Sequence, residues 1–116
     1  MKRRVLLMNA LMMPTAGLTY HPREIDKEAF KSILLDAARD GRLKSYIGYQ
    51  TTADHIKNIV SIDIPMNREP TEACSGDLLL VCKLKYRLND PNLKHSIRLQ
   101  SNIADEDYCY YAVDVT

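Results

Sequence analysis

Three stretches of the chain have the hydrophobic pattern of β-strands. Residues 4–9 hold an unbroken apolar run from Val5 to Met8, which is typical of a strand covered on both faces and which ends at Asn9. Residues 78–86 start with an apolar run and then alternate, which predicts a strand near the centre of a sheet. Residues 108–115 alternate throughout. One face of this last strand is expected to carry Cys109, Tyr111, Val113 and Val115, and the other Tyr108, Tyr110, Ala112 and Asp114.

Two stretches have the periodicity of helices. Asp26 is predicted to cap the start of the first helix, and Gly41 stands at the C′ position where that helix ends. The second helix is predicted to begin at Thr51 or Thr52, with Thr51 and Asp54 forming a capping box. The apolar stripes consist of Phe30, Ile33, Leu34, Ala37 and Ala38 in the first helix and of Ala53, Ile56, Ile59 and Val60 in the second.

Residues 45–68 are the stretch around which a site is expected. Residues 45–48 are predicted to form a short strand that passes through Gly48 into the second helix. Such a joint brings free backbone N–H groups and the positive end of a helix dipole to one point, which suits a phosphate. A plain strand–turn–helix joint that serves stability alone is the alternative, since such joints are common in mixed folds.

The remaining segments are predicted to be short or irregular. Residues 11–23 contain Pro14, Gly17 and Pro22, and their length favours a binding loop, with flexible filler as the alternative. Residues 62–64 alternate like an edge strand that Pro65 stops, and residues 75–77 are expected to turn. Residues 89–101 are polar and predict a flap or a short helix. We find no repeat or linker, so residues 1–116 are expected to form one domain.

The composition narrows the classes of protein. With 116 residues, 46% of them hydrophobic and 27% charged, the chain is typical of one soluble globular domain. A formal net charge of +1 gives no overall field that would attract nucleic acid or a membrane surface. The 3 cysteines and 3 histidines have no disulfide or metal-ligand spacing, so we expect no metal, no cofactor and a reducing cytoplasm. Cys82 and Cys109 are expected to be small buried apolar residues.

A local positive strip is predicted on the strand that begins at residue 78. Lys83, Lys85 and Arg87 occur at every second position and therefore share one face. The strip is either a solvated strand face or part of an anion site. The hypothesis of a structural or nucleic-acid-binding protein rests on this strip alone. Under that hypothesis, binding to long DNA or RNA would weaken steeply with added salt.

Five motifs occur in the order and at the spacing of a known family. They are Asn9-Ala10, Ser45-Tyr46-Ile47-Gly48-Tyr49-Gln50-Thr51-Thr52-Ala53, Pro65-Met66-Asn67-Arg68, Gly76-Asp77 and Leu84-Lys85-Tyr86-Arg87-Leu88. Together they resemble the small viral ring nucleases, which are type III anti-CRISPR proteins of archaeal viruses, phages and prophages. The resemblance runs from Arg4 to about Leu88. It implies an α/β (α+β) fold with a mixed β-sheet of about five strands flanked by helices, in a single domain that forms a symmetric homodimer.

The resemblance also implies a ligand and a site. Family members bind cyclic tetra-adenylate, the messenger that activates CRISPR ancillary nucleases, across the two-fold axis and cleave it without metal. Asn9 matches a ligand-contacting asparagine, Arg68 a pocket-lining arginine, and Arg87 the arginine at the scissile phosphate. Asp90 falls where family enzymes usually carry a glutamate on a closing flap. The expected ligand contacts are Asn9, Ala10, Leu11, Gly48, Tyr49, Gln50, Thr51, Arg68, Lys83 and Arg87.

The chain departs from the family at Tyr49, where family enzymes carry the histidine that is the proposed general acid. Imidazole titrates near neutrality and a phenol near pH ~10, so a tyrosine is a poorer proton donor at neutral pH. The phenol can still donate a hydrogen bond or stack on a base. His55 lies about one and a half helical turns further on and is expected on the helix surface.

Two functional hypotheses follow from this departure. The first is a sponge that holds a cyclic nucleotide immune signal, either a cyclic oligoadenylate or, with Lys83 where the family often has glutamine, another cyclic oligonucleotide or a cyclic ADP-ribose isomer. The second is a slow, metal-independent ring nuclease in which a ribose 2′-hydroxyl attacks the adjacent phosphate. Its catalytic residues would be Arg87, which stabilises charge, and Tyr49 or Asp90, which assist proton transfer.

Overall fold

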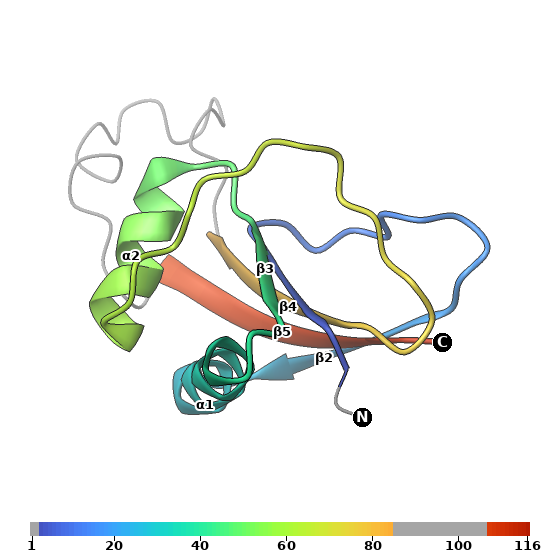
Figure 1. Ribbon diagram of the computed structural model, residues 1–116, viewed down its shortest axis with the longest axis horizontal. Coiled ribbons are helices and arrows are strands. Elements are labelled where there is room, and N and C mark those ends of the chain that lie inside the picture. Colours follow the sequence, from blue (N-terminus) through green and yellow to red (C-terminus); the bar gives the residue numbers. More distant parts are fainter. Residues whose placement is uncertain (1–2, 85–106) are drawn as a thin grey trace.

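The fold combines a mixed five-stranded sheet with helices on one of its faces (Figure 1). A computed structural model describes residues 3–84 and 107–116 of the chain. Its elements are β1 (Val5–Met8), β2 (Tyr20–Ile25), α1 (Lys27–Arg39), β3 (Leu43–Tyr46), α2 (Gln50–Val60), β4 (Leu78–Leu84) and β5 (Tyr108–Val115). This arrangement confirms the predicted single-domain α+β fold with a mixed sheet.

The strands lie in the order β2-β5-β4-β1-β3. β1 is parallel to both of its neighbours, with Met8 opposite Tyr46 on β3 and opposite Val81 on β4. β5 is antiparallel to β4 and to β2. The unbroken apolar runs of β1 and β4 are explained by this position, because both strands are flanked on each side and covered on both faces.

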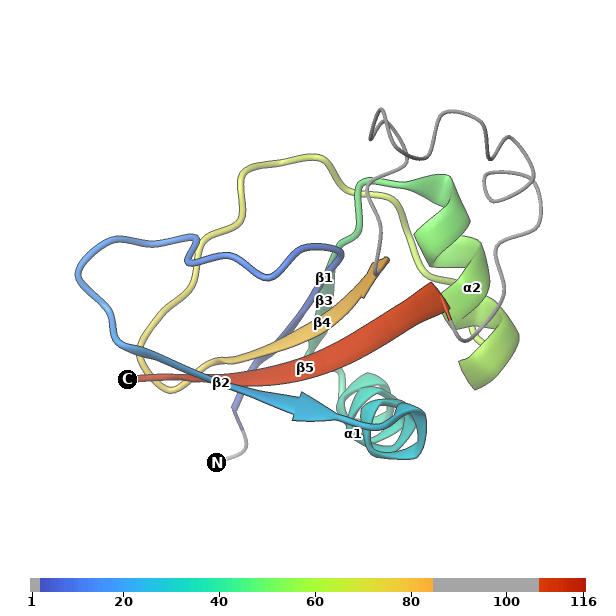
Figure 2. The same ribbon diagram turned by 180° about the vertical axis from the view of Figure 1, so that it is seen from behind.

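The pleat of the sheet divides the core into two layers. Val5 and Leu7 of β1 pack with α1 and α2, whereas Leu6 and Met8 face the other side. That other side is covered by loop residues, including Leu18 and Ala73. The loop after β1 and the segment before β4 lie side by side there (Figures 1 and 2), and Ala73 N donates a hydrogen bond to Thr15 Oγ1 at 2.8 Å. The predicted division of the two faces of residues 108–115 is confirmed.

The two helices start differently. α1 is capped as predicted, because Asp26 Oδ1 accepts from Ala29 N at 2.7 Å, and Gly41 follows its end with a φ of 70°. The capping box predicted for the second helix is wrong. α2 begins at Gln50 with Tyr49 as an N-cap whose side chain caps nothing, and Asp54 instead accepts from Gln50 Nε2 at 2.7 Å.

β2 occupies part of the segment 11–23 that was predicted to be irregular, so the prediction is wrong for residues 20–23. Thr19 and Thr116 exchange both backbone hydrogen bonds at 2.9 Å, which makes them a bonded pair. Counting from Thr19, every second residue of β2 forms backbone hydrogen bonds to β5. Pro22, opposite Val113, is at one of the positions in between, which form none. The N–H that proline lacks would have pointed away from the sheet, so proline costs this edge strand no ladder bond.

The edge strand predicted over residues 62–64 is also absent from the structure. Ile64 is buried in the core layer on the helix-covered side of the sheet. The strand pairing near it consists of one parallel bridge further on, between Ile47 and Met66. β3 itself spans Leu43–Tyr46, two residues earlier than its predicted start. No helix in the described part of the chain has the length and apolar character that a membrane span requires.

Candidate functional site

The candidate site lies at the carboxyl ends of the parallel strands. Asn9 directly follows β1, and Gly48 lies two residues beyond the end of β3. The chain passes from β1 to β3 on one side and later to β4 on the other, so the strand order reverses at β1. Open α/β sheets bind ligands outside the carboxyl ends of strands at such a reversal. Side chains from distant parts of the sequence therefore meet where this topology favours a ligand.

Gly48 is held from both sides of its backbone. Its N–H donates to Asn9 Oδ1 at 2.9 Å, and its carbonyl oxygen accepts from Arg68 Nε at 3.0 Å. A Cβ at this position would stand 3.6 Å from Arg68 Cγ and 3.8 Å from Asn9 Oδ1. Three residues that the sequence predicted as ligand contacts are thus brought together in one hydrogen-bonded unit, which we call the Gly48 cradle (Asn9, Gly48 and Arg68).

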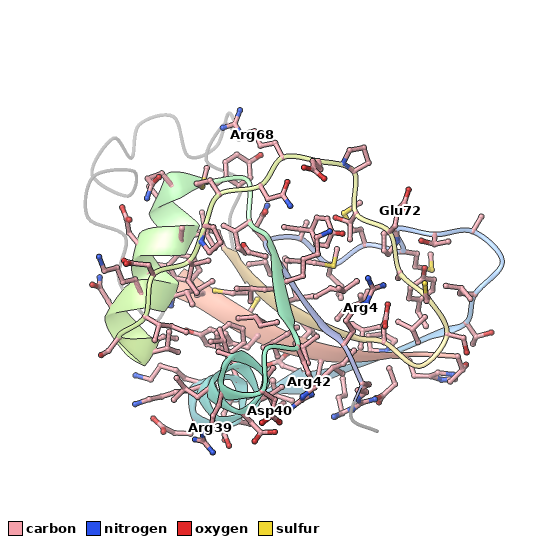
Figure 3. The ribbon with its side chains drawn as sticks, in the orientation of Figure 1. Arg4, Arg39, Asp40, Arg42, Arg68 and Glu72 are labelled. Carbon is pink, nitrogen blue, oxygen red and sulfur yellow. The ribbon has the colours of Figure 1, made fainter. Side chains whose placement is uncertain are left out.

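Arg68 is the cation of the Gly48 cradle. Within residues 3–84 and 107–116 it forms no ion pair, and its hydrogen bond to Gly48 uses Nε. Among the described residues, the terminal Nη1 and Nη2 groups therefore have no carboxylate partner. Figure 3 shows Arg68 on the far side of the molecule from Arg39 and Arg42, so the charge of the cradle is separate from that of the α1 end.

The start of α2 adds uncapped amides to the site. Tyr49 is 59% exposed and provides no side-chain cap. The backbone N–H groups of Gln50, Thr51 and Thr52 have no hydrogen-bond acceptor among the described residues, because the first internal bond of the helix is from Ala53 N to Tyr49 O at 3.1 Å. Free first-turn amides with the positive end of the helix dipole favour an anion.

The other predicted ligand contacts are not joined to the Gly48 cradle by a hydrogen bond between the described residues. Ala10 and Leu11 continue from Asn9, and Leu11 is 43% exposed. Lys83 is half-buried near the end of β4, two residues beyond the pair of Val81 with Met8, and faces the loop-covered side of the sheet. The predictions for Arg87 and Asp90, together with Lys85 and the predicted flap, lie outside the described residues.

His55 is not the surface residue that the sequence suggested. It is 7% exposed, its Nε2 lies 2.8 Å from Tyr110 Oη, and its ring stacks on Tyr108 with 3.8 Å between centroids. Tyr108 Oη donates to Thr51 O at 3.4 Å, and burial raises the pKa of Tyr108. The first half of α2 is thereby fastened to β5. Sequence periodicity could not find this pairing, because it depends on β5, which is more than fifty positions away.

In the described part of the chain, the thiols and the remaining titratable groups form no further site. Burial raises the pKa of Cys82, which is fully enclosed, and Cys109 Sγ donates to Lys83 O at 3.7 Å. Cys74 is exposed. Among the described residues, no three His, Cys, Asp or Glu side chains gather in a way that could hold a metal ion.

A cavity of about 250 Å³ lies at the other end of β1, lined in part by Arg3, Arg23, Arg42 and Asp36. Its guanidinium groups are already paired. Arg3 and Arg23 share Asp114, and Arg42 Nη2 lies 2.9 Å from Asp36 Oδ2. Because each of these guanidinium groups is already paired with a carboxylate, the cavity favours an anion less than the Gly48 cradle does.

Comparison with known proteins identifies the family. The model of the STIV B116-like family matches residues 5–108, which include the whole Gly48 cradle. The chain belongs to the STIV B116-like family. It is similar to uncharacterized protein 26 of Sulfolobus islandicus filamentous virus (isolate Iceland/Hveragerdi), with 33% identity over 87 residues that cover 72% of this chain and 70% of the relative.

Among solved structures, the fold is similar to that of B116 of Sulfolobus turreted icosahedral virus. The TM-score is 0.73 and the match covers 96% of this chain and 98% of B116, with 21% sequence identity. At that identity the likeness shows a shared fold. Both similar proteins belong to viruses.

Proposed function

We propose that this member of the STIV B116-like family is a viral or prophage counter-defence protein that binds and sequesters a cyclic nucleotide immune messenger. The ligand would lie in a pocket at the two-fold interface of a homodimer. The observation that carries the proposal is the Gly48 cradle. In it, Arg68 bonds to Gly48 O through Nε, forms no ion pair with the described residues, and lies next to the uncapped start of α2. The viral origin of the similar proteins supports a role in virus–host conflict.

The chemistry of the cradle fits a phosphodiester. Two Nη groups of Arg68 can donate side by side to two phosphate oxygens, and the amides of Gln50 and Thr51 can donate to a neighbouring oxygen. In a symmetric dimer each cradle occurs twice, which suits a ring with two-fold symmetry. Arg87, which follows the described part of β4 in the sequence, would add a further cation by resemblance to the ring nucleases.

Tyr49 favours holding the ligand over cleaving it. Its side chain is exposed and makes no hydrogen bond to the described residues that would aim its hydroxyl at a leaving oxygen. General acid catalysis requires such aim and a pKa near the working pH, and a phenol ordinarily titrates near ~10. An exposed aromatic ring at the mouth of an anion site is suited instead to stacking on a nucleobase.

The direct test recovers the ligand after binding. The purified protein is incubated with cyclic tetra-adenylate, other cyclic oligonucleotides and cyclic ADP-ribose isomers, freed of unbound ligand, heat-denatured and analysed by mass spectrometry. Sequestration predicts intact ligand in a ratio of one per dimer. Linear products or 2′,3′-cyclic phosphate ends would show the alternative, a ring nuclease in which the 2′-hydroxyl attacks phosphorus and the 5′-oxygen leaves with a proton.

The controls separate site binding from general charge. Arg68→Ala should abolish recovery of the ligand, whereas Arg39→Ala removes an exposed arginine at the end of α1, on the far side of the molecule, and should not. Failure of the wild-type protein to retain any cyclic nucleotide, or a monomeric state by light scattering with and without ligand, would contradict the proposal. Salt-sensitive binding to long DNA or RNA would favour the nucleic-acid-binding alternative.

A further inference from the structure

The segment that carries Arg68 is fastened to β3 by hydrogen bonds more than by packing. Pro65, Met66, Arg68 and Glu69 are all exposed, so little apolar burial holds them in place. Asn67 makes the connections instead. Its backbone N donates to Ile47 O at 2.9 Å, and its side-chain Nδ2 donates to Ser45 O at 3.1 Å.

The same asparagine also shapes the chain beyond Arg68. Asn67 Oδ1 accepts from Glu69 N at 2.9 Å, which closes a tight turn around the arginine. The backbone N–H, the side-chain Nδ2 and the side-chain Oδ1 of Asn67 are therefore all hydrogen-bonded within the protein. Because its Nδ2 bonds to Ser45 O, the side chain of Asn67 is turned toward β3 and not outward with Arg68.

Ser45 supports this attachment from the strand. It is 8% exposed, its Oγ donates to Pro65 O at 2.7 Å, and Ile47 N donates to Ser45 Oγ at 3.3 Å. Ser45 and Asn67 together join β3 to residues on both sides of Met66. This attachment brings Arg68 Nε within 3.0 Å of Gly48 O.

We infer that Asn67 is a positioning residue, which acts on the ligand through Arg68 and does not touch it. The inference rests on the proposed function and deepens it. Because Nε is committed to Gly48 O, Arg68 presents its two terminal amino groups, and the ligand chemistry that fits them is a phosphodiester oxygen pair approached end-on. Without Asn67 the guanidinium would lose this fixed direction while keeping its charge.

A double-mutant cycle tests the coupling. Affinity for the cyclic nucleotide that the wild-type protein binds is measured by calorimetry for Asn67→Ala, Arg68→Ala and the double variant. We expect a loss of about tenfold for Asn67→Ala, and the double variant should bind as weakly as Arg68→Ala alone. Independent, multiplying losses would mean that Asn67 contacts the ligand, and an unchanged affinity in Asn67→Ala would also overturn the inference.

A ligand-free measurement separates this inference from the proposed function. In ¹⁵N-labelled protein, the Nε–H proton of Arg68 should exchange slowly with water because it is bonded to Gly48 O, and Asn67→Ala should make it exchange rapidly. Asn58→Ala, which removes an exposed amide from α2, is the matched control and should leave the signal unchanged. A slow Arg68 Nε–H in Asn67→Ala would refute the positioning role even if the protein bound no nucleotide.

A second variant guards against a folding defect. Ser45→Ala removes the hydrogen bond to Pro65 O but keeps Asn67, and it should produce the same direction of change in both measurements. Circular dichroism and thermal unfolding report whether each variant is folded. If Ser45→Ala and Asn67→Ala are both folded and Arg68 Nε–H stays protected in both, the attachment does not position the arginine.

Discussion

Asn9 and Gly48, 39 positions apart in the sequence, are joined by a 2.9 Å hydrogen bond from the backbone N–H of Gly48 to the side-chain oxygen of Asn9. This bond links the end of β1 to the turn that starts α2. Asn9→Ala should lower the free energy of unfolding by about 1 kcal/mol, since it leaves a part-buried N–H without its acceptor. Urea denaturation measures the change, with the exposed Asn58→Ala as control. Equal stability of Asn9→Ala and wild type would mean that water replaces the asparagine.

Gly48→Ala should separate binding from folding. The added methyl group would meet its neighbours at 3.6 and 3.8 Å, which is ordinary contact, and Gly48 has no positive φ. We therefore expect a change in unfolding free energy below about 1 kcal/mol, as for tolerated glycine substitutions. The methyl group would nonetheless stand between Asn9 and Arg68, so affinity for a cyclic nucleotide should fall at least about tenfold. Calorimetry and thermal unfolding on the same sample check both expectations.

Tyr49→His should restore a general acid if cyclic tetra-adenylate is the ligand. An imidazole at the N-cap of α2 would titrate near neutrality and could protonate the leaving 5′-oxygen, a contribution of about 10²–10⁴-fold. Single-turnover cleavage assays at pH 5–8 would show the gain. Tyr49→Phe is the control, because it keeps the ring and should keep binding. If Tyr49→His cleaves none of the ligands, the result would count against the family correspondence at this position.

His55→Ala should destabilise the protein although His55 is not one of the predicted ligand contacts. The substitution removes the stacking on Tyr108 and the 2.8 Å contact with Tyr110 from a buried position. We expect a loss of about 2–4 kcal/mol in unfolding free energy. His21→Ala, at an exposed contact with Thr116, should cost well under about 1 kcal/mol. Equally small losses for both variants would show that the contacts of His55 with Tyr108 and Tyr110 do not secure α2.

Asp114 should make stability depend on pH. Its hydrogen bond and ion pair with Arg3, and its pairing with Arg23, lower the pKa of Asp114 below its ordinary value. A lowered folded-state pKa stabilises the folded protein above the unfolded pKa of about 3.9, and the contribution disappears as pH falls through the folded value. Asp114→Asn should therefore unfold more easily at pH 7, by about 1 kcal/mol or less for these partly exposed pairs.

The difference between Asp114→Asn and the wild type should shrink below pH ~4 and in 1 M salt, because protonation removes the charge and ions screen it. Thermal unfolding from pH 2.5 to pH 7 records both effects. A difference that is constant across this range would assign the role of Asp114 to packing.

The apolar patterns predicted the central elements well because they are set by burial alone. Residues 5–8 and 78–82 are apolar and buried on both faces of the sheet, and both runs lie in the middle of the sheet as expected. The first helix has a stripe, a cap and a terminal glycine that each act within a few residues. β2 was missed because its exposed residues and Pro22 have no pattern of burial, and it forms where β5 offers a partner edge.

The sequence by itself determined which residues form the core of the sheet and where a glycine leads into a helix. It also supplied the short motifs that resemble those of the viral ring nucleases, whereas the match to a family model placed the chain in the STIV B116-like family. Only the tertiary structure decided that Asn9 and Arg68 hold the two sides of Gly48, that His55 turns inward, and that Asn67 fastens the arginine. Those contacts join residues from different elements, so they arise only once the parallel strands bring their carboxyl ends together.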